Sequence, residues 1–144
     1  MITAVLDTNV LASGFVASRK DSAPVLILDA WRNRAFTLVV SEPILAELAH
    51  TLVSPYFRRR LTPELVAEDL ALLRTEATVS PITSHVHGVA SHPEDDVILS
   101  TAVSAKADYL VTEDAHLQGL RRYKEVEVLS PSDFLAVLLR LPRK

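Results

Sequence analysis

The chain has 144 residues, of which 49% are hydrophobic and 23% are charged, and its formal net charge is −3. This length and composition predict one globular domain, residues 1–144, with a single core. The absence of cysteine excludes disulfide bonds and thiolate zinc sites, and it fits the reducing cytoplasm. No apolar run is long enough to cross a bilayer, so we expect a cytoplasmic protein that makes no contact with membranes.

Net charge and glycine content bear on the class of protein. A negative net charge is not typical of a protein that coats nucleic acid. It does not exclude a nuclease, because acids gathered around a metal ion still present a cation to the substrate. Only three glycines occur, and none forms the glycine-rich loop of a dinucleotide-binding or P-loop protein.

Predicted strands and helices alternate along the chain. The apolar run 2–6 stops at Asp7 and predicts a buried strand, and a short helix follows Asn9. Further strands are predicted at 36–40, 77–80, 108–111 and 126–129. Further helices are predicted at about 24–33, 41–53, 62–74 and 95–106, with a short one ending at Leu120 and a last one beginning at Pro131. This alternation predicts an α/β fold, a three-layer α/β/α sandwich around a parallel sheet of about five strands.

Carboxylates occur where a parallel sheet would gather them. Asp7 ends the first strand and Asp114 follows the fourth, and ligands of open α/β sheets bind outside these strand ends. Asp95 and Asp96 lie in the first turn of a buried helix, and Glu47 borders the apolar stripe of another. Taken singly, an acid at a helix start can be a cap, and an acid on a helix can be solvated. Together they would repel one another unless a cation lay between them, and such oxygen ligands suit Mg²⁺ or Mn²⁺.

Four motifs, in this order, resemble those of the PIN-domain family. They are Val5-Leu6-Asp7-Thr8-Asn9-Val10, Glu47, Pro93-Glu94-Asp95-Asp96-Val97-Ile98-Leu99-Ser100-Thr101-Ala102 and Ala107-Asp108-Tyr109-Leu110-Val111-Thr112-Glu113-Asp114. The resemblance covers essentially the whole chain. It is strongest to the bacterial and archaeal toxin components of toxin–antitoxin systems that are similar to VapC. It implies a PIN-like α/β/α fold and a Mg²⁺- or Mn²⁺-dependent endoribonuclease.

The resemblance also implies roles for particular residues. An acidic catalytic quartet falls on Asp7, Glu47, Asp96 and Asp114. Three of these acids would hold one or two cations for phosphodiester hydrolysis, namely Asp7, Asp96 and Asp114. The residues expected to support them are Asn9, Thr112 and Asp95. Glu113 departs from the family pattern, since many relatives have a small residue there. The implied partners are an RNA substrate, an antitoxin protein and a second copy of the chain in a homodimer.

Other polar groups have weaker interpretations. The segment 56–60 combines two aromatic rings with Arg58, Arg59 and Arg60, which are candidate RNA contacts. The alternative interpretation is that this segment is a solvent-exposed corner whose two aromatic rings pack onto the core. The histidines at 85, 87 and 92 are expected to be loop residues, because no cysteine or clear fourth ligand supports zinc.

Two functions from other classes remain open. A catalytically silent PIN-like module would bind RNA or protein without cutting, but such a protein would be free to lose acids that are present here. A phosphatase or receiver-type domain would also have an acidic pocket. Asn9 stands where the phosphatase motif has a second Asp, and the third strand ends in Val79-Ser80-Pro81 without a phosphoacceptor, so both of these fit poorly.

Overall fold

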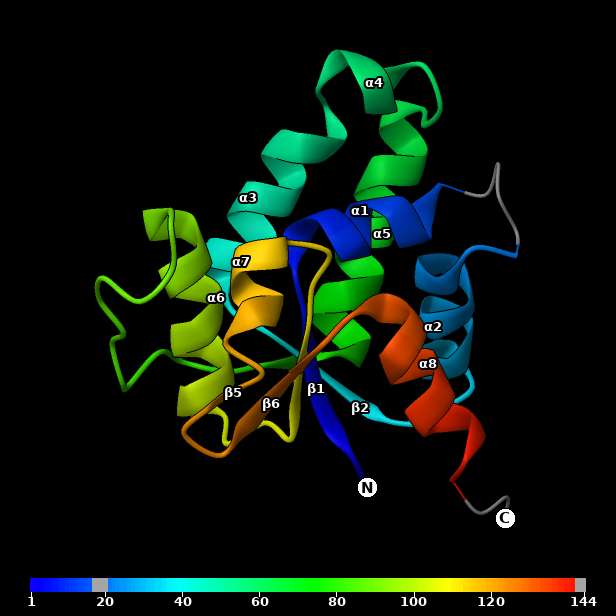
Figure 1. Cartoon of the computed structure of the whole chain (residues 1–144). Helices are drawn as coiled ribbons and strands as arrows, with labels where there is room; N and C mark the ends of the chain where they lie inside the picture. Colours follow the sequence, from blue (N-terminus) through cyan, green and yellow to red (C-terminus); the bar gives the residue numbers. More distant parts are fainter. Residues whose placement is uncertain (17–20, 142–144) are drawn as a thin grey trace.

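The computed structural model describes residues 1–16 and 21–141, and within them a six-stranded sheet has the order β3-β2-β1-β4-β6-β5 (Figure 1). Its strands are β1 (Thr3–Leu6), β2 (Thr37–Val40), β3 (Thr78–Val79), β4 (Tyr109–Val111), β5 (Arg122–Tyr123) and β6 (Val126–Leu129). Five of these described strands run parallel and confirm the predicted sheet. β5 is a correction to the prediction, because it pairs antiparallel with β6 where the sequence suggested only a basic turn.

Eight helices are described. They are α1 (Thr8–Phe15), α2 (Ala23–Arg32), α3 (Glu42–Leu52), α4 (Pro55–Arg58), α5 (Pro63–Glu76), α6 (Pro93–Ser104), α7 (Ala115–Gly119) and α8 (Pro131–Leu139). Six of those helices carry proline at the first or second position, where the fixed φ suits a helix and the missing N–H is not needed. The short α4 was not predicted, and α6 begins two residues before its predicted start. No helix in the described ranges is long and apolar enough to span a membrane.

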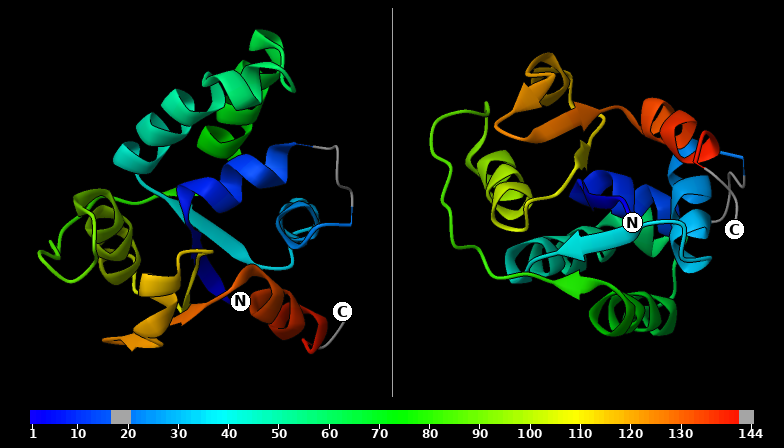
Figure 2. Two further views of the ribbon diagram at one scale, coloured as in Figure 1. Left: turned by 45° about the horizontal axis from the view of Figure 1, so that its top comes forward. Right: turned by 90° about the horizontal axis from the view of Figure 1, so that it is seen from below.

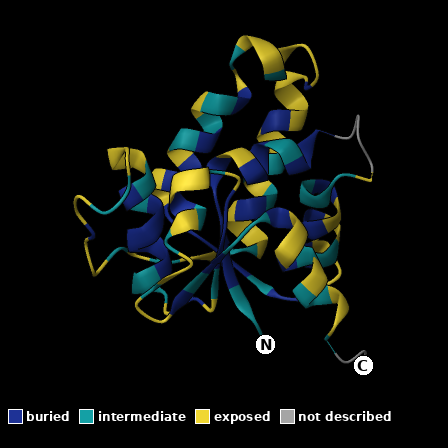
Figure 3. Ribbon diagram, in the orientation of Figure 1, coloured by how far each residue is buried: buried dark blue, intermediate teal, exposed yellow. Residues whose placement is uncertain are grey.

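β1 lies in the middle of the sheet and ends at Leu6, directly before Asp7. It pairs with β2 and with β4, so that Val5 lies opposite both Val39 and Leu110. α6 packs against β1, β2 and β4 on one side, while α2 and α8 lie together on the other (Figure 2). The residues of the sheet centre are buried, and exposed residues lie on the outer sides of the helices and in the connecting loops (Figure 3). The three-layer architecture expected from the sequence is therefore confirmed.

Gly14 allows α1 and α2 to pack closely. A Cβ atom built at this position would lie 2.9 Å from the Pro24 carbonyl oxygen and would overlap the buried side chain of Leu28. We expect Gly14→Ala to lower the free energy of unfolding by ~1–3 kcal/mol, because a backbone oxygen cannot move aside as a flexible side chain can. Urea unfolding measures this loss. Gly119→Ala is the control, since a Cβ there meets no atom within 4 Å, and an equal loss in both variants would contradict the close packing.

Candidate functional site

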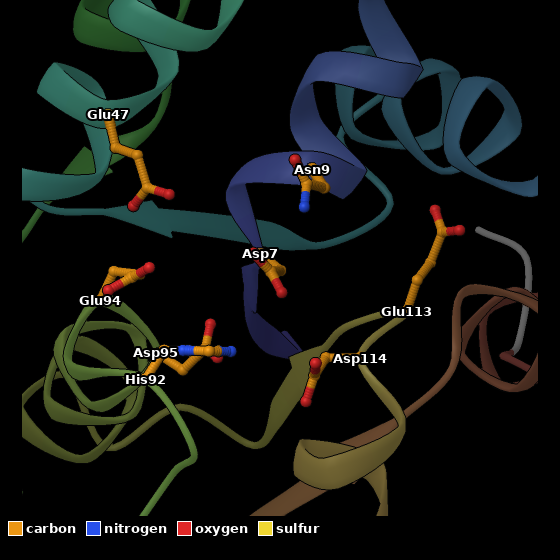
Figure 4. A pocket seen from close by; sticks show the side chains of 8 residues that line it. All are labelled: Asp7, Asn9, Glu47, His92, Glu94, Asp95, Glu113 and Asp114. Atoms are coloured by element: carbon orange, nitrogen blue, oxygen red, sulfur yellow. The ribbon is translucent and has the colours of Figure 1, made fainter.

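A polar pocket of about 360 Å³ opens beyond the carboxyl ends of β1 and β4. It is lined by Asp7, Asn9, Glu47, His92, Glu94, Asp95, Glu113 and Asp114 (Figure 4). We call this the acidic pocket. Its acids come from the end of β1, from α3, from the first turn of α6 and from the segment that joins β4 to α7. Segments far apart in sequence therefore deliver carboxylates to one place.

Asp7 is held at the centre of the pocket by the sheet itself. Its backbone N–H donates to the Val111 carbonyl oxygen at 2.9 Å, so the β1–β4 pairing continues to the residue that precedes α1. The Asp7 side chain is only 6% exposed, and Oδ2 accepts a hydrogen bond of 2.7 Å from the Thr112 hydroxyl. Burial raises the pKa of the Asp7 carboxyl, and the Thr112 hydrogen bond only partly offsets this.

Thr112 connects two of the acids. The same hydroxyl that donates to Asp7 accepts the backbone N–H of Asp114 at 3.0 Å, and the Thr112 side chain is fully buried. Asp114 precedes α7, and its Oδ2 accepts the Leu117 N–H at 2.8 Å as a helix cap. Thr112 therefore hydrogen-bonds to both Asp7 and Asp114, and its role in supporting a catalytic site stays a prediction.

Two further acids resist ionisation. Burial raises the pKa of Glu47, and the nearby charges of Asp7 and Glu94 raise it further. The pKa of Asp95 is raised to about 6, first by burial and then by the charges of Asp7, Asp114 and Glu94. Burial contributes most to both pKa shifts, and the repulsion between neighbouring negative charges adds to them. A cation in the acidic pocket would remove that repulsion.

Asp96 is not where the sequence analysis expected it. Its side chain does not line the acidic pocket, and its carboxylate accepts the backbone N–H groups of Gly88, Val89 and Ala90. Burial acts to raise the pKa of Asp96, but these three hydrogen bonds outweigh it and leave the pKa below its ordinary value. Asp95, expected only as a supporting residue, lies in the pocket instead. On a helix, neighbouring side chains point about 100° apart, and here Asp95 faces the pocket while Asp96 faces the backbone of residues 88–90.

The structure brings the other predicted pocket residues together, whereas the three predicted RNA-contacting arginines lie outside the acidic pocket. Asp7, Glu47, Asp114 and Asn9 all line the acidic pocket. Glu113 lines it as well, but its side chain extends away from Asp7 in Figure 4. The predicted RNA contacts are exposed around α4, in a separate hollow lined by Arg58, Arg59 and Arg60 among others. Arg60 lies over the Tyr56 ring, with its guanidinium carbon 3.7 Å from the ring centre.

Sequence reasoning did not assign Glu94 or His92 to the pocket. Glu94 precedes Asp95 in the first turn of α6, and His92 is the residue before that helix begins. Three consecutive acids at a helix start, above the sheet edge that carries Asp7, were the available signal for Glu94. His92 gave no such signal, since it was one of three histidines in a segment without regular structure.

The chemistry of the pocket suits a divalent cation such as Mg²⁺ or Mn²⁺. Its acids offer hard oxygen ligands. The buried Thr8 hydroxyl makes no hydrogen bond of good geometry in the described residues, but it lies close enough to the Glu47 carboxylate to act to lower the Glu47 pKa. Within those same residues, no three Asp, Glu or His side chains already converge tightly enough to hold one ion. Binding of one ion by three acids would therefore need their side chains to move closer together.

The chain and its fold were compared with known families, curated sequences and solved structures. The sequence profile of the PIN domain matches residues 3–116. A search of curated protein sequences found no match. Among solved structures, the fold is similar to a chain in the crystal structure of VapBC2 from Rickettsia felis bound to a DNA fragment from their promoter, with a TM-score of 0.61. The two are 15% identical, and the match covers 90% of this chain and 98% of that one, so the likeness is one of fold.

Proposed function

Because the chain belongs to the PIN-domain family, whose members are generally nucleases, we propose that it is a Mg²⁺- or Mn²⁺-dependent endoribonuclease and the toxin of a toxin–antitoxin pair. The observation that carries this proposal is the convergence of acids from four separate segments on one pocket. The raised pKa values of Asp7, Glu47 and Asp95 support it, because they mark a site that favours a cation.

In this proposal, Asp7, Asp95 and Asp114 would hold the cation, and Glu47 would complete the site. The third position goes to Asp95 in place of Asp96, because only Asp95 lines the pocket. A bound divalent cation supplies Lewis acidity toward a phosphoryl oxygen and makes water more acidic.

Other residues of the chain would orient the acids of the pocket and bind the RNA substrate. Thr112 fixes the direction of the Asp7 carboxylate through its 2.7 Å hydrogen bond. Asn9 is exposed at the pocket, where its side-chain amide can donate a hydrogen bond to a phosphate oxygen. Arg58, Arg59 and Arg60 would contact the RNA backbone away from the scissile bond, since their hollow is separate from the acidic pocket.

The partners follow from the same assignment. The fold likeness to VapBC2 supports an antitoxin protein as the partner of this chain. The exposed Leu139 of α8 is compatible with a homodimer, which we include in the proposal. A nuclease that acts on cellular RNA would work in the cytoplasm. We also propose that residues 1–144 form one domain.

Metal removal tests the proposal. A mixed RNA pool incubated with the purified protein should be cut in the presence of Mg²⁺ or Mn²⁺, spared in EDTA, and cut again when Mn²⁺ is added back in excess. Single-stranded DNA of the same sequences is the control for substrate class and should remain intact. Cleavage that continues at the same rate in EDTA would contradict the metal-dependent mechanism. If the protein neither binds Mn²⁺ in calorimetry nor cuts RNA, the PIN-like fold serves as a binding module instead.

A further inference from the structure

Residues 83–92 have no helix or strand, yet one side of α6 fixes them along their length. We call these residues the strap. α6 contributes three polar side chains spaced four residues apart, which therefore lie on one side of the helix: Asp96, Ser100 and Ser104. The Ser104 hydroxyl accepts two strap N–H groups at 3.0 Å, the Ser100 hydroxyl accepts one at 2.8 Å, and Asp96 accepts three at 2.8 to 3.2 Å.

Asp96 makes the strongest of these attachments. Its carboxylate is 9% exposed and binds Gly88 at 2.9 Å, Val89 at 3.2 Å and Ala90 at 2.8 Å. Hydrogen bonds to a charged acceptor are shorter and stronger than neutral ones. The strap is thus attached most firmly beside Asp95, at the end of α6 that borders the acidic pocket.

Val89 is held from two helices. Its N–H donates to Asp96 in α6, and its carbonyl oxygen lies 3.4 Å from Nε2 of His116, the second residue of α7. Asp96 follows the pocket residue Asp95, and His116 lies two residues after the pocket residue Asp114. A single strap residue therefore links the first turn of α6, which contains the pocket acid Asp95, to the first turn of α7, which directly follows the pocket acid Asp114.

We propose that Asp96 and His116 are positioning residues that act through Val89 to fix the separation of Asp95 and Asp114. Neither side chain lines the acidic pocket, so neither binds the cation. The inference rests on the proposed metal-dependent function and adds a reason for the acid at position 96. Two like-charged carboxylates repel when no cation lies between them. The contacts of Val89 with α6 and α7 limit how far that repulsion can separate Asp95 and Asp114.

Affinity for Mn²⁺, measured by calorimetry, tests the positioning role of the two Val89 contacts without relying on RNA cleavage. Asp96→Asn replaces an acceptor oxygen by an NH₂ group that cannot accept a strap N–H, and His116→Ala removes the contact to the Val89 carbonyl oxygen. We expect each variant to bind Mn²⁺ ~10-fold more weakly, the usual effect of losing a group that orients metal ligands. Because both act through one residue, the double variant should lose less affinity than the sum of the two single losses.

Two control variants separate positioning from general stability. Asp108→Asn also removes a carboxylate that accepts a backbone N–H, from Thr3 at 2.9 Å, at the opposite end of the sheet. Ser104→Ala frees the end of the strap that is far from Val89. Neither should change the affinity for Mn²⁺. RNA cleavage by Asp96→Asn should recover in saturating Mn²⁺, because the pocket acids are intact and only their spacing is loosened.

The outcomes are distinguishable. Wild-type affinity in folded Asp96→Asn and His116→Ala would overturn the positioning role, and so would full additivity in the double variant. If Asp96→Asn does not fold, His116→Ala decides alone, since His116 is exposed and its loss leaves the Asp96 contacts in place. If the wild-type protein binds no Mn²⁺, the proposed function fails and this inference fails with it. If the wild type binds and the variants match it, only this inference fails.

Discussion

Asp95→Asn should reduce RNA cleavage by ~100-fold or more and should also make the cation-free protein more stable at pH 7.5. The loss of cleavage follows from the removal of one of the carboxylates proposed to hold the cation. The gain in stability follows from the pKa of Asp95, which is raised from 3.8 to about 6 by burial and by the charges of Asp7, Asp114 and Glu94. The asparagine keeps the size of the side chain and removes the charge.

The sign of the stability effect depends on pH. A carboxyl whose pKa is higher in the folded state than in the unfolded chain stabilises the fold below pH 3.8, and this contribution disappears as the pH rises through about 6. At pH 7.5 the charged Asp95 therefore costs stability that an uncharged asparagine at this position would not. After allowance for solvent screening of this partly exposed group, we expect a gain of ~1 kcal/mol.

Thermal unfolding in EDTA at pH 7.5 and at pH 4 measures this effect. The melting temperature of Asp95→Asn should exceed that of the wild type at the higher pH and approach it at the lower one. Asp133→Asn is the matched control, because Asp133 is also in the first turn of a helix but lies outside the acidic pocket. Its loss should bring no gain, since the helix dipole favours an acid there. A melting temperature for Asp95→Asn that is unchanged at pH 7.5 would contradict the repulsion inferred for the pocket.

Asp7→Asn should lower cleavage by ~100-fold or more at any concentration of Mn²⁺ and leave the fold intact. Asp7 is the most buried acid of the pocket, and an asparagine oxygen in its place can still accept the hydrogen bond from Thr112. The substitution therefore removes the charge that a cation needs without leaving the Thr112 hydroxyl unpaired.

Cleavage assays in saturating Mn²⁺ distinguish this variant from one that is only mispositioned. Asp7→Asn should stay inactive where Asp96→Asn recovers, and circular dichroism should show native secondary structure for both. Equal cleavage by the wild type and Asp7→Asn would mean that the acidic pocket is not the source of the activity.

Most of the fold could be predicted because its strands are short, apolar and separated by clear helix starts. The run 2–6 ended by Asp7 gave the central strand, and Pro24, Pro63 and Pro131 marked helix beginnings that the structure confirms. β5 could not be predicted, because two residues such as Arg122 and Tyr123 carry no periodicity and pair only once β6 is present.

The candidate site was predicted less completely, and α6 shows why. The apolar residues of this helix lie on nearly all sides, so its hydrophobic pattern does not indicate which of Asp95 and Asp96 faces the pocket. The side that binds the strap is marked by Ser100 and Ser104, four and eight residues after Asp96. That spacing was visible in the sequence, but its partner was a segment without regular structure, whose path no local pattern predicts.

The pairing of β1 with β4 has a consequence during protein synthesis. Leu6 lies opposite Val111, and the Thr112 hydroxyl binds Asp7 across a sequence separation of 105 residues. A nascent chain on the ribosome therefore lacks the pocket until Asp114 has been added and β4 can insert beside β1. Under the proposed function, the chain therefore has no complete site for cutting RNA until β4 and Asp114 have been made.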